Sequence, residues 1–294
     1  MKQLIVTADD FGAAREVNDA VERAYKDGIL TTASLMVAGP AATDAVNRAK
    51  AMSLPVGLHL VLVEGRPVLP AAEIPDLVDA DGFFRNGMVR AGVDMFFLPY
   101  VRRQLAAEIE AQFKAFAATG LTLDHVNAHK HFHLHPTIAG LTLRIGRHFG
   151  LKAIRVPYEP AEVLRRIEPE TGGSFVVETW ARRLRKRLAA VGIFSPDRVF
   201  GLAWSGAMTP ARLHGLLARL PDGVSEIYLH PATASGFPLA APGYRYEDEL
   251  AALVSQEAID IKNKNEILLG AFGDFLPPAN KNKVAAGHKV ESAV

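Results

Sequence analysis

Short apolar runs and amphipathic segments alternate along most of the chain. Residues 3–8 (QLIVTA) are apolar and rich in branched side chains, as in a buried strand. Val17, Val21 and Ala24 follow at spacings of four and three, which places them on one face of a helix that ends at Gly28. The same order recurs, and it predicts strands at 33–37, 56–61, 153–156, 198–203 and 226–229 and helices at 41–51, 103–118, 137–149, 178–191, 210–220 and 246–260.

A histidine-rich segment, DHVNAHKHFHLHP, runs from Asp124 to Pro136. Its odd positions hold five of the ten histidines of the chain: His125, His129, His131, His133 and His135. Apolar Val126, Phe132 and Leu134 lie between them, so the alternation predicts a half-buried strand with the imidazoles on one face. Imidazole is the commonest metal ligand and the usual acid–base group near neutral pH. A metal or catalytic site therefore explains the run better than a solvated loop does.

The segment 64–100 lacks a clear period and is interrupted by Gly and Pro. We predict a long excursion over the surface, and unstructured loops of this length are usually functional. Its apolar cluster, Met95 to Leu98, is either local packing or a contact for an apolar substrate. The polar segment 277–294 predicts a disordered tail.

About seven repeats of strand and helix predict an α/β protein with a mostly parallel sheet and helices outside it. For 294 residues we expect closure into a (β/α) barrel first and an open doubly wound sheet second. No internal repeat or linker divides the chain, so we predict one domain over residues 1–276.

Composition and charge exclude several classes of protein. The absence of cysteine excludes disulfides, thiolate metal sites and cysteine nucleophiles. The net charge is +1 and the one basic run, 182–187, is typical of a solvated helix face, so no nucleic-acid partner is expected. The start has no apolar h-region, and no uncharged apolar run approaches ~18 residues. We therefore expect a cytoplasmic protein without a signal peptide or a membrane helix.

Polar residues lie where four of the predicted strands end: Asp9 and Asp10, His59, the histidine run, and His230. Parallel α/β folds place their sites at the carboxyl ends of strands. Two imidazoles and a carboxylate can hold a divalent ion, which lowers the pKa of a water molecule towards ~7. A second carboxylate can take the proton of that water, and a histidine can protonate a leaving amine. The set predicts metal-assisted hydrolysis of an amide or ester.

The segments TADDFG, ASLMV, GLHL, IRVPYEP and EIYLHP, with the H-x-N-A-H-x-H-x-H run, resemble the YdjC-like carbohydrate deacetylases over residues 3–260. The resemblance implies a distorted (β/α) barrel that removes N-acetyl groups from amino sugars. It implies these roles: Asp9 as general base, His230 as general acid, Arg155 beside the base, Asp10, His59 and His129 as ligands of one Zn²⁺ or Mg²⁺, and His131, His133 and Asn127 as sugar-binding residues.

Two positions depart from the family pattern. Asn127 stands where an aspartate is usual, and Lys130 follows the metal histidine. The loss of that carboxylate leaves the tuning of His129 open, and spacing alone does not separate His129 from His131 as the third ligand.

Four segments, VNAHKHFHLHP, MVAGPAA, HLVLVEGRPVLP and FFLPYVRRQL, look like the hopanoid-biosynthesis branch of the family. That resemblance implies a glycolipid substrate, an N-acetylglucosaminyl group on a terpenoid lipid. Phe96 and Phe97 would then form a rim for the lipid, and the lipid would bring the protein to the inner membrane.

Two other interpretations stay open. Amidohydrolase-type barrels also use H-x-H, although at the end of the first strand, where this chain has Asp9 and Asp10. A metal-binding or sugar-binding barrel without activity would keep the same ligands. The choice between Zn²⁺ and Mg²⁺, the sugar and the formation of a homo-oligomer are also open.

Overall fold

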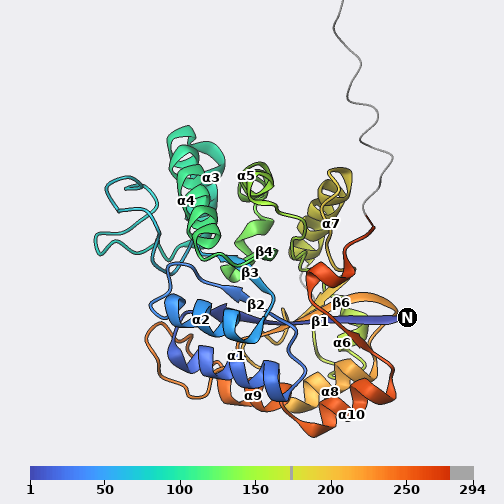
Figure 1. Ribbon diagram of the computed structural model, residues 1–294. Coiled ribbons are helices and arrows are strands. Elements are labelled where there is room, and N and C mark those ends of the chain that lie inside the picture. The colour runs from blue at the N-terminus through green and yellow to red at the C-terminus, as the bar shows by residue number, and fades with distance from the viewer. Residues whose placement is uncertain (173–174, 279–294) are drawn as a thin grey trace, which may run out of the picture.

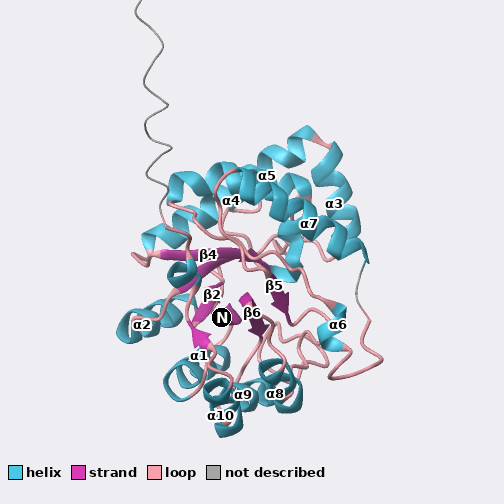
Figure 2. Ribbon diagram, turned by 90° about the vertical axis from the view of Figure 1, so that its right-hand side faces the viewer, coloured by secondary structure: helices cyan, strands magenta, loops and turns pink. Residues whose placement is uncertain are grey.

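In the computed structural model, which describes residues 1–172 and 175–278, seven parallel strands form one curled sheet. The strands are β1 (Lys2–Phe11), β2 (Thr32–Leu35), β3 (Val56–Leu60), β4 (Leu123–Ala128), β5 (Arg198–Phe200), β6 (Gly223–Leu229) and β7 (Leu268–Leu269). Their order is β4-β3-β2-β1-β6-β5, and β7 pairs with the beginning of β1. The curl produces a half-barrel (Figure 2). The predicted α/β fold of a single domain with a distorted (β/α) barrel is confirmed.

An irregular segment bridges the two edges of the half-barrel. Ile154 donates its backbone N–H to the carbonyl of Phe194 and forms an isolated bridge with Val126 of β4. Val199 of β5 donates its backbone N–H to the carbonyl of Tyr158. The strand predicted at 153–156 is therefore present as isolated bridges, which explains the distortion of the barrel.

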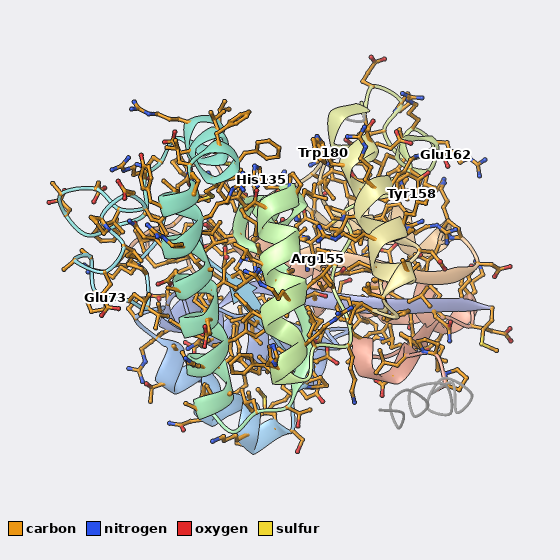
Figure 3. All side chains as sticks on the ribbon, turned by 90° about the horizontal axis from the view of Figure 1, so that it is seen from above. Glu73, His135, Arg155, Tyr158, Glu162 and Trp180 are labelled. Carbon is orange, nitrogen blue, oxygen red and sulfur yellow. The ribbon has the colours of Figure 1, made fainter. Side chains whose placement is uncertain are left out.

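Helices cover the outside of the sheet (Figure 1). They are α1 (Arg15–Asp27), α2 (Ala42–Met52), α3 (Met88–Phe97), α4 (Pro99–Ala118), α5 (Pro136–Gly146), α6 (Ala161–Leu164), α7 (Phe175–Ala190), α8 (Pro210–Ala218), α9 (Tyr246–Leu253) and α10 (Gln256–Lys264), with 3-10 turns η1 (His129–Leu134), η2 (Arg147–Phe149) and η3 (Phe272–Phe275). Helices α4, α5 and α7 lie side by side above the sheet (Figure 3), and α1, α8, α9 and α10 lie below it.

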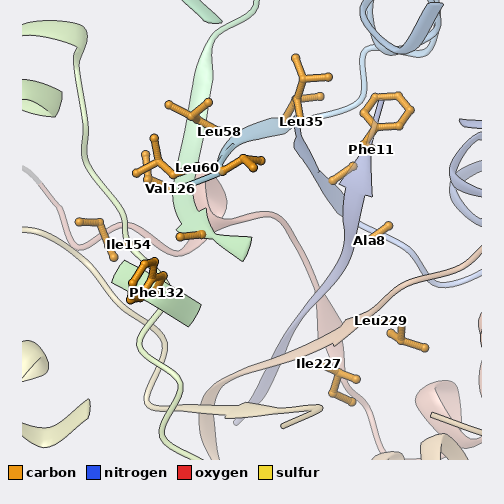
Figure 4. Packing of buried hydrophobic residues seen from close by; sticks show 14 of the residues in the cluster. Ala8, Phe11, Leu35, Leu58, Leu60, Val126, Phe132, Ile154, Ile227 and Leu229 are labelled. Carbon is orange, nitrogen blue, oxygen red and sulfur yellow. The ribbon is translucent and has the colours of Figure 1, made fainter. Parts of the chain in front are cut away.

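The strands send apolar side chains to one face and polar side chains to the other. The apolar face packs against the helices, and Figure 4 shows part of this core: Ala8, Phe11, Leu35, Leu58, Leu60, Val126, Ile227 and Leu229. The alternate positions are buried and polar: Thr7, Asp9, Ser34, His59, His125, Asn127 and Glu226. The hollow of the half-barrel is therefore lined by groups that can bind or react.

The prediction that the histidine run is one strand with five imidazoles on one face is wrong. β4 ends at Ala128, which pairs with Leu60. Leu60 is the last residue of β3, so β3 offers no strand residue with which the residues after Ala128 could pair. The chain turns into η1, where Lys130 and His131 have φ of 52° and 54°. The histidines after Ala128 therefore point in different directions.

Two other predictions need correction. The excursion 64–100 contains a helix, α3, whose apolar residues partly face outwards and so give no core-facing period. The last predicted helix is two helices. The helix α9 ends before Val254, and the Ser255 hydroxyl accepts a hydrogen bond from the backbone N–H of Ala258 and so caps α10.

The predicted tail lies, from residue 279 onwards, outside the described residues. Among the described residues, no helix is both long enough and apolar enough to cross a membrane.

Candidate metal and catalytic site

Three predicted ligands converge at the carboxyl ends of β1, β3 and β4. Asp10 Oδ1 lies 3.2 Å from His59 Nε2 and 3.3 Å from His129 Nδ1, and the ligand atoms of the three residues lie within 4.8 Å of one another. Asp10 Oδ1 and His59 Nε2 are buried and have no hydrogen-bond partner within the described part of the chain. Buried polar atoms without a partner are costly, and two imidazoles with a carboxylate suit Zn²⁺. The residues present therefore fit a divalent ion.

A kink in β1 brings Asp9 and Asp10 to the same site. Adjacent residues of a regular strand point to opposite faces. Asp10, however, has a φ of 61°, and the register between β1 and β2 shifts between Ala8 and Phe11. Aspartate tolerates this left-handed conformation better than most residues. Asp9 therefore stays in the hollow while the carboxylate of Asp10 turns to His59.

Asp9 is held in a buried ion network. Arg155 donates from Nη1 to Asp9 Oδ2 at 2.5 Å and from Nη2 to Asp9 Oδ1 at 3.0 Å. It also donates from Nε to Glu226 Oε1 at 2.9 Å, and all three side chains are buried. Burial acts to raise the pKa of Asp9, but the charge and hydrogen bonds of Arg155, together with His59 and His230, outweigh burial and hold this pKa well below its ordinary value. Asp9 is thus an ionised carboxylate beside the ligand set.

His230 lies at the end of β6, on the other side of Asp9. Its backbone N–H donates to the buried carboxylate of Glu249, and its ring packs at 5.7 Å from the ring of Tyr228 and 5.1 Å from that of Tyr244. Its Nδ1 is buried and, within the described residues, makes no hydrogen bond. The ring is therefore placed by packing and by the backbone.

The later histidines of the run lie outside the ligand set. His131 Nε2 is 2.8 Å from the Tyr228 hydroxyl, and His133 Nε2 donates to the carbonyl of Arg155 at 2.9 Å. Burial lowers the pKa of both rings, that of His133 to about 3, so both are neutral at pH 7. His135 packs against Phe96 with 6.0 Å between ring centroids. The geometry thus brings His129, and not His131, to Asp10 and His59.

Asn127 lies behind His59 and is fully buried. Its Oδ1 is 2.7 Å from His59 Nδ1, and its Nδ2 donates to Asp9 Oδ1 at 3.0 Å and to Ser34 Oγ at 2.8 Å. The replacement of the usual aspartate by Asn127 therefore changes the surroundings of His59 and Asp9. The sequence had suggested that it changes those of His129. Sequence reasoning also missed Glu226, although a charged residue within the apolar strand EIYL was a signal for it.

The chain was compared with known protein families and proteins. The family described as YdjC-like protein matches residues 3–263. The chain belongs to this YdjC-like family. It is 30% identical to the carbohydrate deacetylase of Geobacillus stearothermophilus, over 92% of this chain and 97% of that protein. It is 32% identical to the human carbohydrate deacetylase, over 82% of this chain and 76% of that protein.

A solved structure shares the fold of this YdjC-like protein. The Enterococcus faecalis protein named for cellobiose-phosphate cleavage superposes with a TM-score of 0.73 at 24% identity, covering 94% of this chain and 99% of that one.

Helix α3 gives this YdjC-like protein an exposed apolar stripe. The stripe is made of Val89, Val93, Phe96 and Phe97, and Phe97 is 67% exposed. Four arginines close to it in the sequence are exposed as well: Arg85, Arg90, Arg102 and Arg103. The guanidinium of Arg102 lies 5.9 Å from the ring centroid of Phe96. Phe96 joins the stripe to the histidine turn through its contact with His135. The stripe therefore lies on a helix that packs against the segment carrying His129.

Proposed function

We propose that this protein is a metal-dependent carbohydrate deacetylase that removes the N-acetyl group of an amino sugar. The observation that carries the proposal is the convergence of Asp10, His59 and His129 beside the ionised carboxylate of Asp9. The relatives from Geobacillus stearothermophilus and human, which are named carbohydrate deacetylases, support the substrate class.

Asp10, His59 and His129 would hold the divalent ion, which when bound acidifies a water molecule and polarises the amide carbonyl. Asp9 takes the proton of the attacking water, and the two hydrogen bonds from Arg155 keep its carboxylate ionised and oriented. His230 protonates the nitrogen as the C–N bond breaks. The products are acetate and the free amino sugar.

Asp9→Asn tests the role of the base. The variant keeps an oxygen for Arg155 but cannot take a proton, so acetate release from N-acetylglucosamine oligosaccharides should fall by about 10²–10⁴-fold. Metal content, measured by elemental analysis, should stay unchanged because Asp9 is not a ligand. Asp27→Asn, an exposed carboxylate at the end of α1, serves as the control and should retain full activity. No acetate from the wild-type protein would support a binding barrel without this chemistry, and full activity of Asp9→Asn would exclude Asp9 as the base.

We further propose that the sugar is carried by a lipid, such as an N-acetylglucosaminyl hopanoid in the inner membrane. The apolar stripe of α3 supports this proposal, because burying apolar surface against lipid contributes roughly 25 cal/mol per Å². The exposed arginines close to it in the sequence suit anionic headgroups.

The double substitution Phe96→Ala and Phe97→Ala tests the lipid contact. Turnover of a lipid-linked substrate in vesicles should fall, while turnover of a soluble disaccharide should stay the same, because the stripe lies outside the ligand set. Val191→Ala, which shortens an exposed apolar side chain elsewhere, is the control. Equal turnover of both substrates by the double variant and the wild type would exclude a lipid rim at these residues.

A further inference from the structure

A chain of buried hydrogen bonds runs behind His59, away from the ligand set. His125 Nδ1 is 2.9 Å from Asp124 Oδ2, and His125 Nε2 is 2.9 Å from Ser34 Oγ. The Asp124 carboxylate also accepts the backbone N–H of Gly273 at 2.9 Å. An ionised carboxylate only accepts, so His125 Nδ1 carries a proton. In the neutral form of the ring, His125 Nε2 then accepts from the Ser34 hydroxyl.

The same logic fixes the amide of Asn127. Ser34 Oγ uses its hydrogen on His125, so it accepts from Asn127 Nδ2 at 2.8 Å. The second N–H of Asn127 points to Asp9 Oδ1 at 3.0 Å, where again only an acceptor is present. Both donors of the amide are therefore used, and its oxygen must be the atom 2.7 Å from the ring of His59.

The orientation of Asn127 decides the tautomer of His59. Asn127 Oδ1 can only accept, so His59 Nδ1 carries the proton. In the neutral ring, which is the form that binds metal, His59 Nε2 then has the lone pair, and it lies 3.2 Å from Asp10 Oδ1, on the side of the ligand set. A neutral imidazole whose second nitrogen donates to a fixed acceptor is the form that binds a metal ion.

We propose that Asn127 is a positioning residue with two separable tasks. Its oxygen fixes the tautomer of His59 for the divalent ion, and its NH₂ group holds the carboxylate of Asp9. The inference rests on the proposed metal-dependent function. Asn127 is 0% exposed and its amide contacts three protein groups, so it acts through His59 and Asp9 and does not touch the sugar.

Two substitutions separate the tasks. Asn127→Ala removes both, and its affinity for Zn²⁺, measured by calorimetric titration of metal-free protein, should fall by about 10–100-fold. Asn127→Asp has the same shape, keeps an acceptor for His59 Nδ1 and loses the donor to Asp9. It should bind Zn²⁺ at least as tightly as the wild type, yet release acetate at least about 10-fold more slowly at saturating metal. Thr142→Val, a buried change in α5, is the control and should alter neither quantity.

Thermal unfolding of each metal-free variant shows whether it is folded, and the isosteric Asn127→Asp keeps the test available if Asn127→Ala does not fold. Asn127→Ala binding Zn²⁺ as tightly as the wild type, or Asn127→Asp binding it less tightly than the wild type, would overturn the inference and leave the proposed function standing. A wild-type protein that binds no divalent ion would overturn both.

Discussion

At the scale of single residues, Arg155 links the stability of the hollow to its chemistry, because it pairs with both buried carboxylates. It is fully buried, it donates to the carboxylates of Asp9 and Glu226, and its guanidinium lies 4.4 Å from the ring centroid of Tyr228. Two buried carboxylates are tolerated there because one cation lies between them, while the Thr7 hydroxyl donates to Glu226 Oε1 and the Asn127 amide donates to Asp9 Oδ1. Removing the cation leaves both negative charges without compensation.

Arg155→Met should therefore lower the free energy of unfolding by about 3–5 kcal/mol, as breaking a buried ion pair usually does. Urea denaturation at pH 7 measures this loss. The control is Arg182→Ala, because Arg182 pairs with Glu178 on the exposed side of α7 and should leave the stability unchanged. Wild-type stability of Arg155→Met would contradict the view that the two carboxylates depend on this residue.

A residue of this site can be predicted from the sequence when its immediate neighbours in the chain show where it lies. Asp10 and His59 directly follow or end apolar strands, so their position at the sheet edge could be inferred. His129 and His131 could not be separated, because the choice depends on the turn of η1, where two residues have positive φ. The hydrogen bond between Asn127 and His59 could not be predicted either, since it depends on the pairing of β4 with β3.

At the scale of elements, β3 combines a ligand with a position that must be glycine. Gly57 lies two residues before His59, on the same face of the strand. A Cβ at Gly57 would lie 2.5 Å from Nδ1 of the His125 ring, which stacks on Phe272 with 4.1 Å between ring centroids. The missing side chain makes room for the imidazole that holds Ser34.

Gly57→Ala should displace His125 and destabilise the protein by about 1–3 kcal/mol, the usual cost of overpacking a core. Thermal or urea unfolding gives this difference. Gly172→Ala is a matched control, because no atom that the structure describes, other than those of its chain neighbours, lies within 4 Å of a Cβ at that position. Equal stability of the two variants would show that the hollow can accommodate the methyl group.

Most elements follow from local patterns, and the exceptions have physical causes. The spacing of Val17, Val21 and Ala24 predicts α1 because all three residues are buried on one face. α3 escaped prediction because Val89, Val93 and Phe97 are exposed on its outer side. Apolar residues that face outwards give a pattern that reasoning from core packing does not recognise.

At the scale of the whole molecule, the parallel sheet gathers residues from distant parts of the chain at one edge. Asp10, His59 and His129 come from the ends of β1, β3 and β4, and β2 lies between β1 and β3 in the sheet. The alternation of strand and helix predicts this parallel arrangement, but not the distortion. That depends on contacts far apart in sequence, such as the bridge between Val126 and Ile154.

The most direct test of the account is a calorimetric titration of metal-free protein with Zn²⁺. We predict one ion per chain for the wild type and an affinity lower by at least about 100-fold for His59→Ala and for Asp10→Ala, since each removes a direct ligand. His148→Ala, an exposed histidine, should bind as the wild type does. No saturable binding by the wild type, or unchanged affinity in both ligand variants, would contradict the claim that these residues share one cation.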